Sequence, residues 1–182
     1  IKMVAQTRVD CAAGSAGLMR FARAEAIHHA RVRSAFGKRL VEQAMMQSVL
    51  ADMALEVEAA TSLALRVARS YDDARTDEAA RAFARAATPI AKYWATHRAP
   101  QLTFEAMECL GGAGYVEESA LPRLYREAPV NSIWEGSGNV QCLDVLKAMA
   151  KDPAALAALF AEIELARGAH VALDAALRDT KA

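Results

Sequence analysis

The sequence predicts an all-α protein, an antiparallel up-down four-helix bundle with an extra C-terminal helix. Ala accounts for 43 of the 182 residues, and Ala loses no side-chain entropy when a helix forms. Apolar residues recur every three or four positions over long stretches, which is the periodicity of an amphipathic helix. The 9 Gly and 5 Pro residues are too few for a turn-rich all-β protein. With 54% hydrophobic residues, the chain can bury one core without disulfides or a structural metal.

Two long helices are expected in the first seventy residues. The first runs from about residue 2 to residue 34, contains no proline, and ends before Gly37. The second runs from about residue 43 to residue 71. Its apolar stripe, which is more typical of a core than of a cofactor site, consists of Met46, Leu50, Met53, Val57, Ala60, Ala64 and Val67.

A third long helix is expected from about residue 77 to residue 110, with Thr76 or Asp77 as its cap. Pro89 and Pro100 should kink it or open it locally, because each removes a backbone donor. The segment Gly111-Gly112-Ala113-Gly114 ends this helix. It is not a dinucleotide fingerprint, since it follows a helix instead of a strand and its spacing is wrong.

The last third of the chain contains shorter elements. We expect a short helix over residues 121–127, a loop over 129–139, a fourth bundle helix over about 139–150, and a fifth helix that begins at Asp152-Pro153. Short connections imply that neighbouring helices are antiparallel. The predicted organisation is therefore a bundle over residues 1–150 and a helical extension over residues 151–182.

Composition narrows the possible function. Lys plus Arg equals Asp plus Glu at 22 each, so net charge gives no argument for nucleic acid or an anionic membrane, although a local basic face remains open. The three cysteines suit neither a disulfide framework nor a zinc site, and they indicate a reducing, cytoplasmic compartment. No metal site and no membrane-spanning segment are expected, since the chain has no run of about 18 apolar residues.

The segment 128–139 is the least helix-like stretch and contains Trp134 and Glu135 between small and polar residues. A carboxylate beside an indole in a desolvated cleft would have a raised pKa, as a general base requires. The alternative is an ordinary solvated loop carboxylate. Gly136-Ser137-Gly138 is not the nucleophile elbow of hydrolases, and the histidines have no nucleophile or zinc spacing.

Four motifs occur in order along residues 1–150: Thr7-Arg8, Arg33-Ser34-Ala35-Phe36-Gly37, Glu108-Cys109-Leu110-Gly111-Gly112-Ala113-Gly114-Tyr115, and Ile133-Trp134-Glu135-Gly136-Ser137-Gly138-Asn139. Together they resemble the C-terminal helical domain of the acyl-CoA dehydrogenase superfamily. The segments 117–127 and 132–139 are more specifically similar to its AidB-type branch, which is associated with the alkylation response.

The resemblance implies an FAD-dependent oxidoreductase acting on an acyl-CoA thioester. Glu135 matches the glutamate that removes the substrate α-proton, and Arg8 matches an arginine near the active site. Another branch has its base at the position of Thr7. The positions that match cofactor contacts are Arg33, Phe36, Glu108, Gly111, Gly112, Trp134, Ser137 and Asn139. Ser137 could also cap the fourth helix.

The resemblance also implies assembly, because Arg33, Phe36 and Glu108 match residues that reach the FAD of a neighbouring subunit in a dimer or tetramer. Three positions depart from the family pattern: Glu108 replaces Gln, Trp134 replaces Tyr, and Ala5 replaces an acidic residue. The family's N-terminal helical domain and middle β-domain are expected to be absent, which would leave this chain with part of a site. A flavoprotein that binds DNA is the alternative function.

Overall fold

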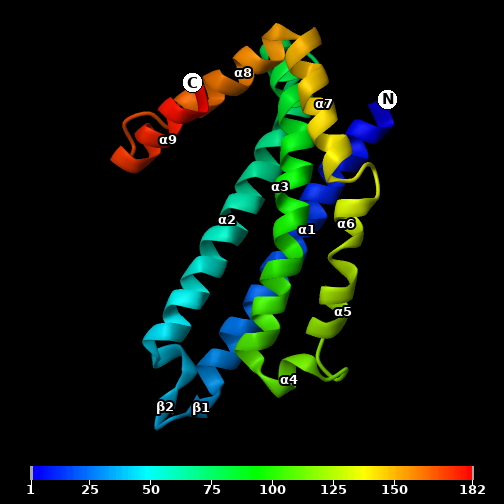
Figure 1. The fold of residues 1–182 in the computed structure, drawn as a ribbon. Helices are drawn as coiled ribbons and strands as arrows, with labels where there is room; N and C mark the ends of the chain where they lie inside the picture. The colour runs from blue at the N-terminus through cyan, green and yellow to red at the C-terminus, as the bar shows by residue number, and fades with distance from the viewer. Residues whose placement is uncertain (1, 182) are drawn as a thin grey trace.

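Three long antiparallel helices form the body of the molecule in a computed structural model that describes residues 2–181. They are α1 (Lys2–Val32), α2 (Ala44–Asp73) and α3 (Glu78–Leu110), and each packs against the other two (Figure 1). A small hairpin joins α1 to α2. It consists of β1 (Ser34–Ala35) and β2 (Lys38–Arg39), paired antiparallel, and a short 3₁₀ helix, η1 (Leu40–Glu42), follows it.

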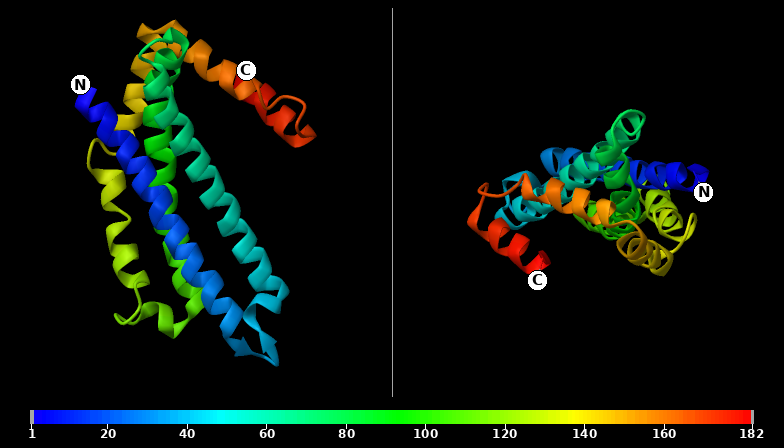
Figure 2. Two further views of the ribbon diagram at one scale, coloured as in Figure 1. Left: turned by 180° about the vertical axis from the view of Figure 1, so that it is seen from behind. Right: turned by 90° about the horizontal axis from the view of Figure 1, so that it is seen from above.

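The fourth position of the bundle is filled by several short helices. After α3 the chain turns at α4 (Gly112–Tyr115) and returns along the bundle as α5 (Leu121–Glu127), α6 (Val130–Ile133) and α7 (Gly138–Lys151). The views in Figures 1 and 2 show these segments beside α1 and α3. The predicted all-α, up-down architecture is confirmed, although the expected loop at 129–139 contains the single turn α6.

The C-terminal part leaves the bundle as an arm. It consists of α8 (Pro153–Glu164), predicted from Asp152-Pro153, and α9 (Val171–Lys181), so the extension expected over residues 151–182 is helical but is divided into two helices. Figure 2 shows this arm extending sideways from one end of the bundle. Arg66 on α2 holds α8 through two hydrogen bonds of 2.6 and 2.7 Å to the Glu162 carboxylate, and its guanidinium lies 4.2 Å from the Phe83 ring centroid.

The core is built largely from alanine, so the helices lie close together. One cluster fills the end of the bundle near the hairpin, and the other fills the end near α8. Met19 is fully buried in the first, and Val67 and Phe83 are buried in the second. The predicted α2 stripe is confirmed, with Met46 half-buried and its other members buried.

Local details correct some of the predictions. Asp77 caps α3 by accepting hydrogen bonds from the amides of Ala79 and Ala80. The helix continues from Glu78 to Leu110, so the local opening expected at Pro89 or Pro100 does not occur. Pro89 is fully buried, and core packing there offsets the backbone donor that proline lacks. Ser137 occupies the cap position of α7, but its side chain forms no capping hydrogen bond.

None of the helices in residues 2–181 has the length and apolar character that a bilayer span requires. Within the same residues, no group of three or more His, Cys, Asp or Glu side chains is placed to hold a metal ion.

Candidate functional site

Glu135 lies in a strained turn between α6 and α7. Its φ angle is +56°, in the left-handed region that disfavours residues with a Cβ atom, and the φ angle of Gly136 is +100°. A Cβ atom on Gly136 would lie 2.7 Å from Val140 Cγ1 and 2.9 Å from Gln141 Nε2. Only glycine therefore fits directly after Glu135. We refer to residues 132–136 as the glutamate loop.

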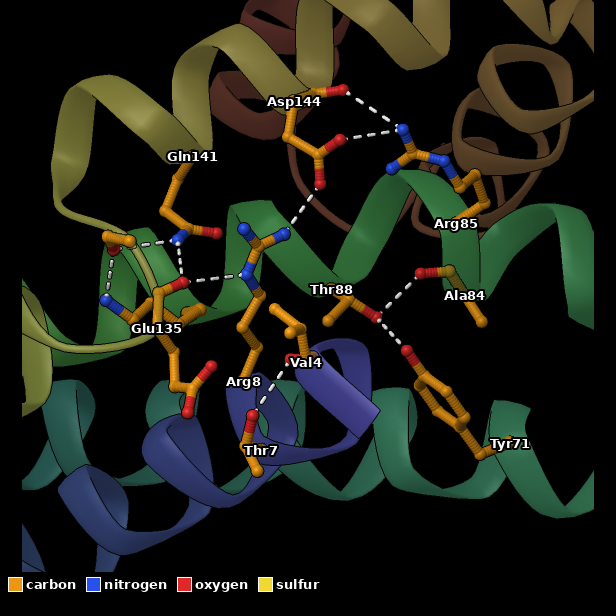
Figure 3. A network of polar contacts seen from close by, with 12 residues as sticks. Val4, Thr7, Arg8, Tyr71, Ala84, Arg85, Thr88, Glu135, Gln141 and Asp144 are labelled. Atoms are coloured by element: carbon orange, nitrogen blue, oxygen red, sulfur yellow. Dashed lines mark hydrogen bonds and ion pairs between the residues drawn. The ribbon is translucent and has the colours of Figure 1, made fainter. Parts of the chain in front are cut away.

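Side-chain donors from two helices hold the backbone of this loop. Arg8 on α1 donates from Nε to the carbonyl oxygen of Glu135 at 3.0 Å (Figure 3). The buried Gln141 on α7 donates from Nε2 to the same oxygen at 3.1 Å and to the carbonyl oxygen of Gly136 at 2.8 Å. These bonds satisfy carbonyl groups that the left-handed turn directs into the protein, so they stabilise a conformation that costs energy by itself.

A third donor comes from α3. Lys92 is fully buried and donates from Nζ to the carbonyl oxygens of Gly136 at 2.7 Å and Ser132 at 3.2 Å. Burial lowers the pKa of the Lys92 ammonium below its ordinary value of 10.5. Burial likewise raises the pKa of the neighbouring Cys11 thiol above 9.0. Burial thus disfavours the charged form of both groups beside the glutamate loop.

Arg8 also belongs to an ion-pair network that joins three helices. Its Nη1 donates to Asp144 Oδ2 at 2.6 Å, while Arg85 Nη2 donates to Asp144 Oδ1 at 2.8 Å (Figure 3). Partial burial alone would raise the pKa of Asp144, but the hydrogen bonds and charges of Arg85 and Arg8 outweigh burial and lower the pKa below 3.8. The structure thus brings Arg8 to the glutamate loop as a bridge between α1 and α7, and its guanidinium is largely engaged there.

The Glu135 side chain points away from this network, toward α1 (Figure 3). It lines a pocket of about 350 Å³ together with Thr7, Asp10, Cys11, Gly14, Asn131 and Trp134. Glu135 is half-buried, and its carboxylate forms no hydrogen bond or ion pair with the residues that the structure describes. The Thr7 hydroxyl donates to the Val4 carbonyl oxygen at 3.0 Å. The pocket therefore presents two carboxylates, Glu135 and the exposed Asp10, and of these only Glu135 belongs to a backbone segment that side chains from neighbouring helices hold in place.

The predicted site residues fall into two groups. Trp134, Ser137 and Asn139 lie next to Glu135, and all three are exposed, with the Trp134 side chain 55% exposed. An exposed hydroxyl and an exposed amide at the start of α7 are available to a ligand beside the glutamate loop. The indole of Trp134 lines the same pocket as the Glu135 carboxylate.

The other group lies at the opposite end of the bundle, on the hairpin and at the end of α3. Phe36 is 94% exposed with a φ angle of +54°, and Arg33 and Glu108 are also exposed. Gly111, with a φ angle of +62°, and Gly112 have no atom within 4 Å of an added Cβ. Arg8 and Arg33 are 25 residues apart on and just beyond α1, so the two groups are separated by roughly 37 Å at 1.5 Å per residue.

Sequence reasoning did not find Lys92, Gln141, Asp144 or Arg85. The sequence contained a signal for three of them. Gln141 and Asp144 are three residues apart on α7 and so share a face. Lys92 also lies among the buried residues Pro89, Ala91 and Ala95, where a lone lysine is unusual. The sequence could not show which distant residue each of these side chains contacts.

Comparison with known proteins identifies the fold. The family model described as acyl-CoA dehydrogenase, C-terminal domain, matches residues 1–150. The chain belongs to the acyl-CoA dehydrogenase family. It is 52% identical to AidB of Escherichia coli strain K12 over 151 residues, which are 83% of this chain and 28% of that protein. It is 38% identical to the mitochondrial short-chain specific acyl-CoA dehydrogenase of Bos taurus over 140 residues, 76% of this chain and 32% of that one.

A solved relative covers almost the whole chain of this acyl-CoA dehydrogenase family member. The crystal structure of Caenorhabditis elegans ACDH-11 in complex with C11-CoA superposes with a TM-score of 0.87 at 30% identity, over 98% of this chain and 31% of that one. The coverage includes the C-terminal arm. The chain therefore spans about a third or less of the length of these relatives.

Proposed function

We propose that this chain is the C-terminal domain of an FAD-dependent, acyl-CoA dehydrogenase-like oxidoreductase, and that Glu135 is its catalytic base. The observation that carries the proposal is that the backbone of Glu135 is held by hydrogen bonds whereas its carboxylate is not. Arg8 and Gln141 hold the Glu135 backbone, while its carboxylate lines a pocket and forms no hydrogen bond or ion pair within residues 2–181. A group arranged in this way keeps its position and remains available to take a proton.

In the proposed reaction, Glu135 accepts the α-proton of an acyl-CoA thioester while a hydride leaves the β-carbon and a carbon–carbon double bond forms. FAD, when bound, supplies the acceptor for that hydride. Glu135 is half-buried, and the Trp134 indole and the Cys11 side chain line the pocket beside it, so part of the carboxylate surface is already shielded from solvent. A base in a partly desolvated site is more effective than the same carboxylate in water.

The residues present have the chemistry that FAD requires. At the hairpin end, the Arg33 guanidinium can pair with a pyrophosphate and the exposed Phe36 ring can pack on an adenine. Gly111 and Gly112 leave open space for a nucleotide to approach the backbone. Glu108 offers an acceptor only, so it would contact a hydroxyl or an amine of the nucleotide instead of a phosphate.

Near the glutamate loop, Ser137 and Asn139 would hold the FAD of the same subunit, and Trp134 would lie beside its reactive ring. The Ser137 hydroxyl forms no hydrogen bond with the α7 amides, so it is available to donate to a phosphate or ribityl oxygen.

The test replaces Glu135 by Gln in the full-length, FAD-loaded protein and follows the bleaching of the flavin by acyl-CoA. Loss of a general base should slow flavin reduction roughly 10²- to 10⁴-fold. Glu58→Gln, at an exposed position on α2, is the matched control and should react at the wild-type rate. Reduction of Glu135→Gln at the wild-type rate would show that the base is another residue.

The two groups of predicted FAD residues lie too far apart to serve one cofactor, which supports a homo-oligomer, a dimer or tetramer with shared sites. The α7 helix also exposes the apolar side chains of Val140, Leu143, Leu146 and Met149. Two-fold symmetry would let such surfaces close on themselves. Sedimentation of the chain at micromolar concentration should give a dimer or tetramer without bound FAD, and a 19.5 kDa monomer would contradict this assembly.

DNA binding by the full-length protein is a second candidate function. Arg31, Arg33 and Lys38 are exposed at the hairpin end, and none of them forms an ion pair with the residues that the structure describes. Phosphate contacts release counterions, so DNA affinity should fall steeply between low and physiological salt. Affinity that is independent of salt would exclude this mode of binding.

We also propose a reducing, cytoplasmic location. Cys11, Cys109 and Cys142 are free, and burial raises the pKa of the Cys109 thiol to about 11, which makes it unreactive. Cell fractionation tests the location directly, and recovery of the protein with periplasmic markers would contradict it.

A further inference from the structure

Lys92 on α3 is a charged residue buried without a counter-ion in contact. Its relative exposure is 0%, and within the described residues its ammonium forms no ion pair. Instead it donates to two backbone carbonyls, those of Gly136 at 2.7 Å and Ser132 at 3.2 Å. Burying an ammonium without a carboxylate is costly, so a structure that keeps one there gains something else from it.

The two carbonyls are the ends of the glutamate loop. Ser132 belongs to α6, Gly136 begins the connection to α7, and Glu135 lies between them. Arg8 reaches only the Glu135 carbonyl, and Gln141 reaches those of Glu135 and Gly136. Among the described hydrogen bonds, those of Lys92 therefore join both ends of the loop to one atom, Nζ, of a side chain on α3.

The close fit of the loop on α3 supports this role. A Cβ atom on Gly138 would lie 3.0 Å from Tyr93 Cε2 and 3.2 Å from His97 Nε2, so the start of α7 lies directly against the turn of α3 that follows Lys92. With the loop this close, a side chain of lysine length can reach both carbonyls from within the core.

We propose that Lys92 is a positioning residue for Glu135, which fixes the glutamate loop so that the carboxylate stays directed into the pocket. The inference rests on the proposed function of Glu135 as the base. Lys92 acts through the backbone and does not touch substrate. Its removal should lower the rate of proton transfer without altering the residues that bind the acyl chain.

The experiment compares Lys92→Met with wild type in the full-length, FAD-loaded protein. Met has a similar length and no donor, and Lys147→Met, at an exposed position on α7, is the matched control. We expect kcat for acyl-CoA oxidation to fall about 100-fold without a matching rise in KM, because displacement of a catalytic group by about 1 Å costs that much. Lys147→Met should keep the wild-type kcat.

Hydrogen exchange measured by mass spectrometry provides a readout independent of activity. Loss of charge-assisted hydrogen bonds should raise exchange at least about tenfold in peptides covering residues 130–138. Peptides from α1 and α2 should exchange as in wild type. If Lys92→Met does not fold, Lys92→Gln, which retains one donor group on a shorter side chain, serves in the same comparison.

The outcomes separate the two proposals. Unchanged hydrogen exchange at residues 130–138 overturns the positioning role. An equal rise in exchange throughout α1 and α2 overturns it too, because Lys92 would then stabilise the whole bundle and not the glutamate loop in particular. A kcat equal to that of wild type overturns it as well. If acyl-CoA fails to reduce the wild-type flavin while the loop still exchanges faster in Lys92→Met, the proposed function fails but the anchoring of the loop by Lys92 is supported.

Discussion

Replacement of Gly136 by Ala tests the geometry of the glutamate loop most directly. The φ angle of +100° is unfavourable for any residue with a Cβ atom, and this should cost roughly 1–2 kcal/mol. The new methyl group would also lie 2.7 Å from Val140 Cγ1 and 2.9 Å from Gln141 Nε2, and overpacking of this kind costs roughly 1–3 kcal/mol. We expect the free energy of unfolding to fall by about 3 kcal/mol.

Gly17→Ala is the matched control, with the opposite expected sign. Gly17 lies within α1, and an added Cβ atom there has no neighbour within 4 Å. Because Ala favours the helix over Gly, this change should stabilise the protein by about 1 kcal/mol. At 2–4 °C per kcal/mol for a chain of this size, the Tm should fall by about 6–12 °C in Gly136→Ala and rise by about 2–4 °C in Gly17→Ala.

Thermal unfolding followed by far-ultraviolet circular dichroism measures both variants. The reasoning is refuted if Gly136→Ala melts at the wild-type temperature while Gly17→Ala is stabilised as expected. In that case the loop would reach another conformation at no cost, and its strained turn would not be fixed by packing against α7.

Two further predictions concern ion pairs. Asp144→Asn should lower the free energy of unfolding by about 2 kcal/mol at pH 7, because Arg8 and Arg85 lose a charged acceptor. Because folding lowers the pKa of Asp144, the carboxylate stabilises the folded state at pH values above its unfolded pKa, and this stabilisation is lost as the pH falls below 3.8. In urea unfolding, the difference in unfolding free energy between Asp144→Asn and wild type should therefore shrink at low pH. Arg66→Met should speed hydrogen exchange in α8, because it removes both hydrogen bonds to Glu162, whereas Arg69→Met, which removes an exposed pair, should not. Equal exchange in α8 of the two variants would contradict the role of Arg66 in holding the arm.

Sequence periodicity predicted the long helices well, because small and apolar residues recur every three or four positions along each of them. The α2 stripe and the Asp77 cap are local features, and both are present in the structure. The two-residue strands β1 and β2 were not predicted, since so short a ladder leaves no alternation to recognise. The helical extension over residues 151–182 was predicted as one helix, whereas the structure divides it into α8 and α9 at a turn that contains Gly168, whose φ angle is +84°.

Prediction of the site was limited by long-range contacts. The motif around Glu135 indicated a base, and the structure adds a pocket and a free carboxylate. The anchors of the loop could not be predicted, because Arg8 and Asp144 are 136 positions apart and Lys92 and Gly136 are 44 apart. Left-handed backbone at Glu135 was also unpredictable, since a side chain other than glycine adopts it only when distant groups compensate.

A single uninterrupted helix, α1, connects the residues beside the pocket to those on the hairpin. Its residue count sets both the distance between the two ends and their relative rotation. One inserted residue would turn the hairpin by about 100° around the helix axis, and seven would restore the angle to within about 20° but add about 10 Å of length. The angular register of the two ends therefore depends on chain length between Arg8 and Arg33, and no side-chain substitution within that stretch could restore it after an insertion or deletion.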